Sequence, residues 1–151
     1  MQNETSKAEQ SYSTLFTVWS ALFASQFTFI VILFFIRPEL FKFDLTKPLL
    51  NENAVIVVAL GVASLINIAV SIALRKNFVE RAIAESKVEL VQTGMIVGCA
   101  LAEVVSLIGL FLALAFDYQY FFIFSILGTL GMLLHFPKRS TVHAASFRQN
   151  E

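Results

Sequence analysis

The chain is built from long apolar blocks separated by short polar connectors. The blocks cover residues 15–36, 54–74, 94–116 and 118–136, and only the third contains an Asp, Glu, Lys or Arg side chain. About 20 residues in an α-helix cross a hydrocarbon core of about 30 Å, and each block reaches roughly that length. The pattern therefore predicts an all-α, polytopic integral membrane protein with four transmembrane helices.

The segments outside this membrane domain, which covers residues 15–136, are polar. Residues 1–14 form a polar N-terminal segment, and residues 137–151 form a polar C-terminal tail. The N-terminal segment carries two acidic residues and one lysine, whereas a cleavable signal peptide begins with a basic region. We therefore expect the first span to remain in the mature protein.

The connector at 75–93 contains no glycine or proline and is rich in residues that favour helices. It predicts that the second and third helices continue past the bilayer as a helical hairpin, with a turn near Glu85 to Lys87. This hairpin is a candidate docking site for a soluble partner, although its charges also fit a solvated helix surface. The last connector is reduced to Asp117 and its neighbours, so the third and fourth helices should be tight antiparallel neighbours.

The distribution of basic residues predicts the orientation. The N-terminal segment, the 75–93 connector and the C-terminal tail hold 1, 4 and 3 of the 11 Lys and Arg residues, and the 37–53 connector holds the other three. If the four spans alternate, the first three segments share one side of the membrane. The positive-inside rule then places both termini and the hairpin in the cytoplasm, with the protein in an inner or plasma membrane.

Composition narrows the function classes. With 57% hydrophobic residues and a mean hydropathy of +0.73, the chain is too apolar for a soluble domain of this size. Its formal net charge of zero gives no sign of a nucleic-acid partner. Cys99 is the single cysteine, and His135 and His143 are separate, so neither a disulfide nor a metal site is expected. No catalytic motif with a defined spacing occurs, so we expect no cofactor and no enzymatic activity.

Glu103 is the only charged residue in the 94–116 block. A carboxyl group at that depth costs a few kcal/mol when ionised, so we expect it to be protonated at neutral pH or to have a partner. Asn67 lies eight residues inside Arg75 and Glu103 ten inside Thr93, which puts the two side chains at a similar depth and predicts a hydrogen bond between them. Glu103 and Asn67 are therefore candidate ion-binding residues, and a purely structural hydrogen bond is the alternative.

A stripe of small residues follows one face of the third helix. Such residues let helix backbones approach closely in a membrane, where dispersion and weak hydrogen bonds replace the hydrophobic drive. The stripe predicts a packing face for helix association, and its members are Gly94, Gly98, Ala102, Ser106, Gly109 and Ala113.

Residues 92–110 carry a pattern that resembles a known family. The pattern consists of Gln92-Thr93, then Gly98-Cys99-Ala100-Leu101-Ala102-Glu103, then Ile108-Gly109. It is similar to the second helix of the c-subunit proteolipid of rotary ATP synthases, which carries Gln-Thr, Gly-x-Ala-Leu-x-Glu and Ile-Gly. The resemblance implies that Glu103 carries the translocated ion. Sodium-binding members place Ser or Thr where this chain has Val104, so the resemblance implies a proton.

Two main hypotheses follow. In the first, the chain is a divergent c-subunit-like proteolipid that assembles through helices two and three, as a homo-oligomer or within a membrane complex, and binds a proton at Glu103. In the second, it is a non-catalytic accessory or scaffold subunit of a larger membrane complex, with Glu103 structural. A small exporter is a third reading, but small drug exporters are shorter chains and place the carboxylate in their first helix, where this chain has only Gln26.

Overall fold

The computed structural model describes residues 2–42, 44, 46–50 and 52–146, with side chains from Ala8 onward within these ranges. Every regular element in these ranges is helical, so the all-α prediction is confirmed for them. In chain order the elements are α1 (Gln2–Ile36), the 3-10 helix η1 (Pro38–Phe41), α2 (Ala54–Ala84), α3 (Val88–Phe116), α4 (Phe121–Leu134) and α5 (Arg139–Ser146).

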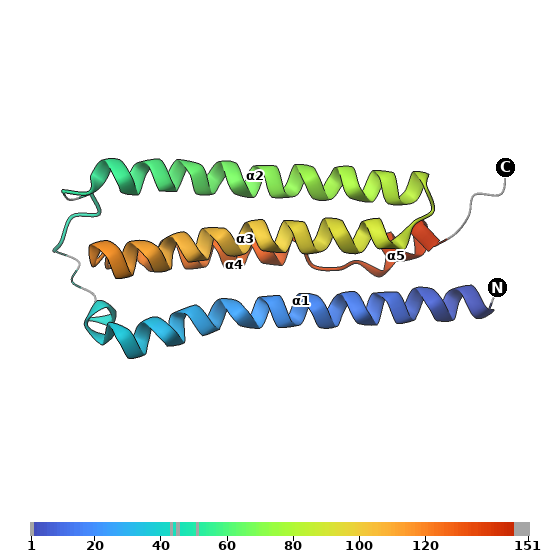
Figure 1. Cartoon of the computed structure of the whole chain (residues 1–151), viewed down its shortest axis with the longest axis horizontal. Coiled ribbons are helices and arrows are strands. Elements are labelled where there is room, and N and C mark those ends of the chain that lie inside the picture. Colours follow the sequence, from blue (N-terminus) through green and yellow to red (C-terminus); the bar gives the residue numbers. More distant parts are fainter. Residues whose placement is uncertain (1, 43, 45, 51, 147–151) are drawn as a thin grey trace.

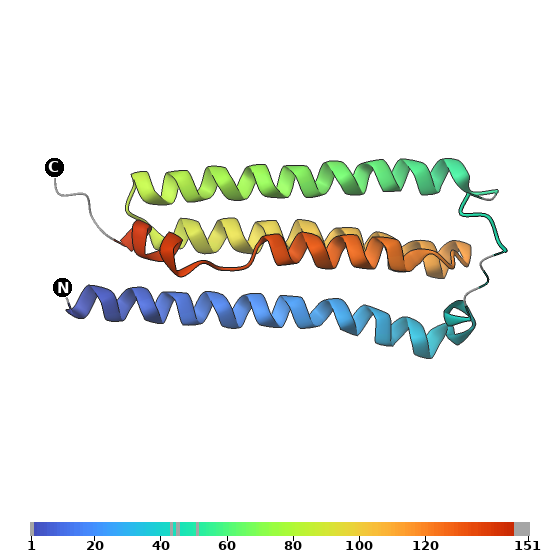
Figure 2. The same cartoon turned by 180° about the vertical axis from the view of Figure 1, so that it is seen from behind.

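The helix α3 is the centre of the bundle. Figure 1 shows α1, α2 and α3 as long rods side by side, with α3 between the other two and α4 behind it. The reverse view in Figure 2 shows α4 directly against α3, and α5 at the same end as the start of α1. The helix α3 contacts α1, α2, α4 and α5, so it is the element around which the others are placed.

Three helices are long and apolar enough to cross a membrane. They cover Ala8–Ile36, Ala54–Ala84 and Val88–Phe116. The 14 residues of α4 extend over about 21 Å, which is less than a hydrocarbon core of about 30 Å. A fourth span exists only if α4 and α5, which are bent by 42° relative to each other, are counted as one. The predicted helix at 118–136 is therefore shorter than expected, and the protein has three to four candidate spans.

Both segments that flank the predicted membrane domain contain helix. Helix α1 already begins at Gln2, so the polar N-terminal segment extends the first helix. The C-terminal tail contains α5, in which Val142 and Ala145 are fully buried. Their spacing of three places both on one face of the short helix, and this face covers Leu15 and other core residues at the end of the bundle.

The reversals from α2 to α3 and from α3 to α4 are short. Helix α2 ends at Ala84 and α3 begins at Val88, so the chain turns across residues 85–87, where the sequence places the turn. A hydrogen bond of 2.8 Å from the Lys87 ammonium lowers the pKa of Glu85 in this turn. At the other end α3 stops at Phe116, and the left-handed conformation of Asp117 (φ 50°) directs the chain into α4.

The stripe of small residues on α3 is buried inside one chain. All six members are buried. Most of them face α4 or His135, the residue directly after α4. A Cβ atom on Gly98 would lie 2.6 Å from the His135 ring, and one on Gly109 would lie 2.8 Å from the Phe121 carbonyl. Only Gly94 meets α2, at Phe78. The stripe therefore packs α3 mainly against α4 within the chain.

Replacing Gly98 by leucine should destabilise the bundle, because the new side chain would overlap the imidazole of His135. Overpacking of this kind costs about 1 to 3 kcal/mol. The measurement is the thermal unfolding of the detergent-solubilised protein, followed by Trp19 fluorescence. Gly61→Leu is the matched control, since a Cβ atom there meets nothing within 4 Å. An equal loss of stability in both variants would contradict the packing described for Gly98.

Candidate functional site

Glu103 lies on the side of α3 that faces α1. Its side chain is half-buried, and its Oε1 atom is 2.8 Å from the hydroxyl oxygen of Ser25 in α1. The same Ser25 hydroxyl is 2.6 Å from the carbonyl oxygen of Leu22, one turn earlier in α1. The carboxyl group is therefore joined through one hydroxyl to the backbone of a neighbouring helix.

The Ser25 hydroxyl has one hydrogen and two acceptors within reach. If Glu103 is ionised, Ser25 donates to the carboxylate. If Glu103 is protonated, the carboxylic acid donates to the Ser25 oxygen, and the Ser25 hydrogen turns to the Leu22 carbonyl. Both patterns use the same heavy-atom positions, since the two distances are 2.8 and 2.6 Å. The two heavy-atom distances thus fit either direction of the hydrogen bond between Ser25 and Glu103.

Asn67 does not pair with Glu103. Its Nδ2 atom donates a hydrogen bond of 2.8 Å to the carbonyl of Leu101. This bond joins α2 to α3, whereas Glu103 contacts α1, on the other side of α3 (Figure 1). Residues 101 and 103 are about 200° apart around a helix, so similar depth alone could not bring the two side chains together. Asn67 is a link between helices and not part of the carboxyl site.

A second polar contact lies one turn along α3 from Glu103. Ser106 donates a hydrogen bond to the Oε1 atom of Gln26, the neighbour of Ser25 in α1. Gln26 is only 2% exposed, and its Nε2 atom has no hydrogen-bond partner among the described residues. Ser25 is not among the residues predicted from the sequence, although Ser25-Gln26, two adjacent polar residues in a 22-residue apolar block, is a signal that could have indicated it.

His135 is buried at the end of α4, with 1% of its surface exposed. Its Nε2 atom is 3.0 Å from the Ser71 hydroxyl, and that hydroxyl is 2.7 Å from the Ile68 carbonyl. The Ser71 hydroxyl has one hydrogen, so it donates either to the Ile68 carbonyl, with Nε2 of His135 donating to Ser71, or to Nε2 itself. The ring rests on Gly98, so His135 fixes the end of α4 against α2 and α3.

Two further side chains hold the C-terminal end of α4. The Arg75 guanidinium donates to the carbonyls of Leu134 and Phe136, the latter at 2.8 Å. The indole of Trp19 donates to the Met132 carbonyl at 3.1 Å. The last carbonyls of a helix lack partners within the helix and carry partial negative charge. Donors from α1 and α2 therefore terminate α4 where its apolar sequence ends.

The other His, Cys, Asp and Glu side chains that the structure describes do not form a metal site. Among the residues that the structure describes, no three His, Cys, Asp or Glu side chains are grouped so that they could hold a metal ion. Cys99 is fully buried in the core cluster between the helices. Glu103 is the single carboxyl group in the four apolar blocks.

No protein-family model, curated protein or solved structure matches this chain. The resemblance of residues 92–110 to the ATP synthase c-subunit therefore stays a prediction. The hydroxyl that joins Glu103 to α1 is a feature of this chain that the resemblance did not include.

Replacing Ser25 by alanine should lower the stability of the bundle by about 1 kcal/mol, the typical value for a side-chain hydrogen bond between membrane helices. Thr17→Ala is the control in the same helix, because Thr17 bonds only to the Ser13 carbonyl of α1 itself. Thermal unfolding in detergent measures both effects. A smaller loss for Ser25→Ala than for Thr17→Ala would contradict a structural contribution of the contact to Glu103.

Replacing Arg75 by methionine should cost about 1.5 to 3 kcal/mol, because two carbonyls at the end of α4 would lose a charged donor. Arg81→Met, in the same helix, is the comparison, since Arg81 makes only an exposed ion pair with Glu85 at 3.4 Å and such pairs contribute about 0 to 1 kcal/mol. Chemical denaturation in mixed micelles gives both values. Similar losses in the two variants would show that α4 does not depend on Arg75.

Proposed function

We propose that this protein is a non-enzymatic integral membrane subunit that takes up and releases a proton at Glu103. The observation that carries the proposal is the position of the Ser25 hydroxyl, 2.8 Å from Glu103 and 2.6 Å from the Leu22 carbonyl. This hydroxyl can stabilise either protonation state of the carboxyl group. A carboxyl group in a membrane-spanning helix is costly when charged, and such residues commonly mark proton or ion pathways.

A proton fits the site better than a metal cation. A cation such as Ca²⁺ needs six or more oxygen ligands, whereas the contacts of Glu103 supply one carboxyl group and one hydroxyl. Val104, the next residue, is exposed and adds no ligand. The resemblance to the c-subunit proteolipid points to the same residue and to the same ion.

The way in which the proposed subunit assembles differs from the first expectation. Because α4 covers the small residues of α3, copies of the chain or partner subunits would meet on the outer face of α2. That face is apolar over most of its length, with exposed side chains at Val55, Val58, Val62, Leu65, Ile66 and Val70. Lipid tails or a neighbouring subunit can cover such a surface.

The proposed orientation places the end with the 85–87 turn in the cytoplasm. The start of α1, this turn and α5 lie together at one end of the bundle (Figure 1). The N-terminal segment, the 75–93 connector and the C-terminal tail together hold eight (1, 4 and 3) of the 11 Lys and Arg residues, and cytoplasmic loops carry the excess of Lys and Arg. We accordingly propose an inner or plasma membrane location, with both termini on the cytoplasmic side.

An accessory or scaffold subunit is the second candidate. It is favoured by the fact that the Glu103 contact joins α1 to α3, which is also what a permanently protonated, structural glutamate would do. In that case the hairpin end, with exposed Arg81 and Lys87, would be the surface for a soluble partner. The two candidates differ in whether the proton at Glu103 exchanges.

Labelling with dicyclohexylcarbodiimide tests the proposal, because this reagent modifies protonated carboxyl groups in apolar surroundings. We expect one adduct on Glu103 at near-neutral pH, none in Glu103→Gln, and none on Glu85 or Glu89 at the hairpin end. Peptide mass spectrometry locates the adduct. Absence of label on Glu103 would mean that the group is ionised or inaccessible, and the proton-carrier proposal would be wrong.

The pH dependence of labelling separates the two candidates. A group that exchanges its proton should be labelled more slowly as the pH rises, because the reactive protonated form becomes scarce. A structural glutamate should be labelled at a constant rate over the whole range in which the bundle stays folded, as monitored by Trp19 fluorescence. A constant rate would therefore favour the accessory subunit.

A further inference from the structure

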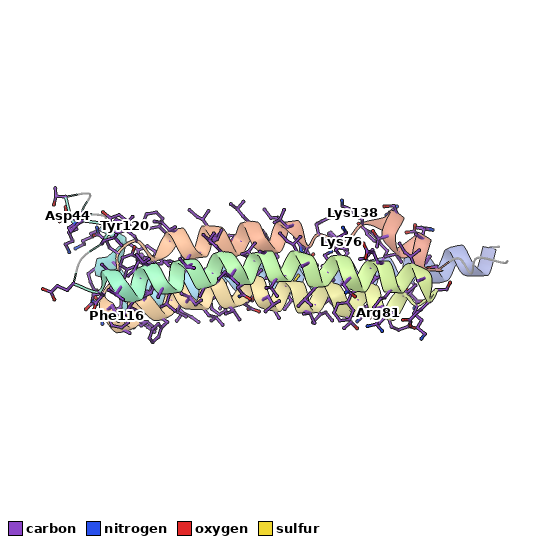
Figure 3. All side chains as sticks on the ribbon, turned by 90° about the horizontal axis from the view of Figure 1, so that it is seen from above. Asp44, Lys76, Arg81, Phe116, Tyr120 and Lys138 are labelled. Carbon is purple, nitrogen blue, oxygen red and sulfur yellow. The ribbon has the colours of Figure 1, made fainter. Side chains whose placement is uncertain are left out.

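A basic pocket opens at the end of the bundle where α1 starts and α5 lies. It is located between α2 and the connection from α4 to α5. Its volume is about 310 Å³. The cationic side chains that line it are Arg75, Lys76 and Lys138. Its apolar wall consists of Ile72, Val79 and Leu134. Figure 3 shows Lys76 and Lys138 at the same end of the molecule, on neighbouring ribbons. The pocket thus combines positive charge with an apolar surface.

The positive charge of the pocket is poorly balanced. The Arg75 guanidinium bonds to two backbone carbonyls, and within the described residues neither Arg75 nor Lys138 has a carboxylate partner. Lys76 is 3.8 Å from Glu80, and both side chains of this pair are mostly exposed. Exposed pairs of this kind are weak, so the pocket favours an anion.

The pocket lies at the depth where the apolar surface of the bundle ends. Arg75 and Lys76 directly follow the apolar block at 54–74, and Leu134 is the last residue of α4. At the same level the ring centroids of Trp19 and Phe136 lie 4.9 Å apart, and Phe136 is 39% exposed. The cations therefore lie at headgroup depth, directly beside surface that faces lipid tails.

From these contacts we propose that the pocket binds the phosphate of an anionic phospholipid. Lys76 and Lys138 hold the phosphate oxygens, with the remaining donors of Arg75 behind them. The acyl chains extend along the exposed apolar side chains of Ile72 and Leu134, which are 45% and 58% exposed. Basic pockets between membrane helices are typical binding sites for such headgroups. The site is independent of the proton at Glu103.

The apolar wall distinguishes a lipid from a free phosphate ion. Inorganic phosphate could contact the three cations and Thr141, but it has no apolar part to cover the exposed Ile72 and Leu134. A phospholipid uses both parts of the pocket at once. Because Arg75 also holds the end of α4, a bound headgroup would brace the junction between α2 and α4.

The test measures lipid binding by the full chain in detergent with native mass spectrometry. The probes are dioleoylphosphatidylglycerol, dioleoylphosphatidylcholine and inorganic phosphate. The pocket variant is K76Q/K138Q, which leaves the structural Arg75 in place. The control is R81Q/K87Q, which removes the same charge from the hairpin turn at the same end of the bundle. Thermal unfolding checks that both variants stay folded.

We expect one phosphatidylglycerol to bind tightly to the unaltered protein, about tenfold more weakly to K76Q/K138Q, and nearly unchanged to R81Q/K87Q. Equal binding by the pocket variant and the unaltered protein would overturn the site. An equal loss in both variants would show a general charge effect and would also overturn it. Phosphatidylcholine binding as tightly, or displacement of the lipid by inorganic phosphate, would overturn the assignment to an anionic phospholipid.

Discussion

The close contact between α3 and α4 is the constraint on which the rest of the bundle depends. Gly98 and Gly109 let the two helices approach closely. The His135 ring and the Phe121 carbonyl occupy the space that a side chain at these positions would need. In a bilayer there is little hydrophobic drive between helices, so this close packing must supply much of the association energy. Because α4 covers this face of α3, α1 and α2 pack on the two sides of α3 (Figure 1).

The same contact explains where the polar groups lie. Helix α4 is short, so its end stays within reach of the other helices. Arg75 in α2 and Trp19 in α1 donate hydrogen bonds to carbonyls at this end, and His135, directly after α4, contacts Ser71 in α2. Asn67 and Ser25 perform similar roles for α2 and α1 along the length of α3. Each bond joins two helices, which is how polar residues stabilise a membrane bundle without exposure to lipid.

The two proposed sites use different parts of this arrangement. Glu103 lies in the apolar part of α3, where a single hydroxyl from α1 can follow a change of protonation. The basic pocket lies at the edge of the apolar region, where the ends of α2 and α4 bring together charges that are far apart in the sequence. A headgroup bound there would stabilise the end of α4, on which the central packing depends.

The sequence alone was sufficient for the helical class, three of the long apolar spans and both short reversals, because each depends on local pattern. It could not decide which helix covers the small residues of α3, or that Glu103 meets Ser25 while Asn67 meets Leu101. Apolar residues surround each span on all sides, so the pattern carries little information about which face meets which neighbour. The shortened α4, the buried α5 and the pocket at Arg75 were likewise decided by tertiary packing, since each requires residues that lie tens of positions apart to meet.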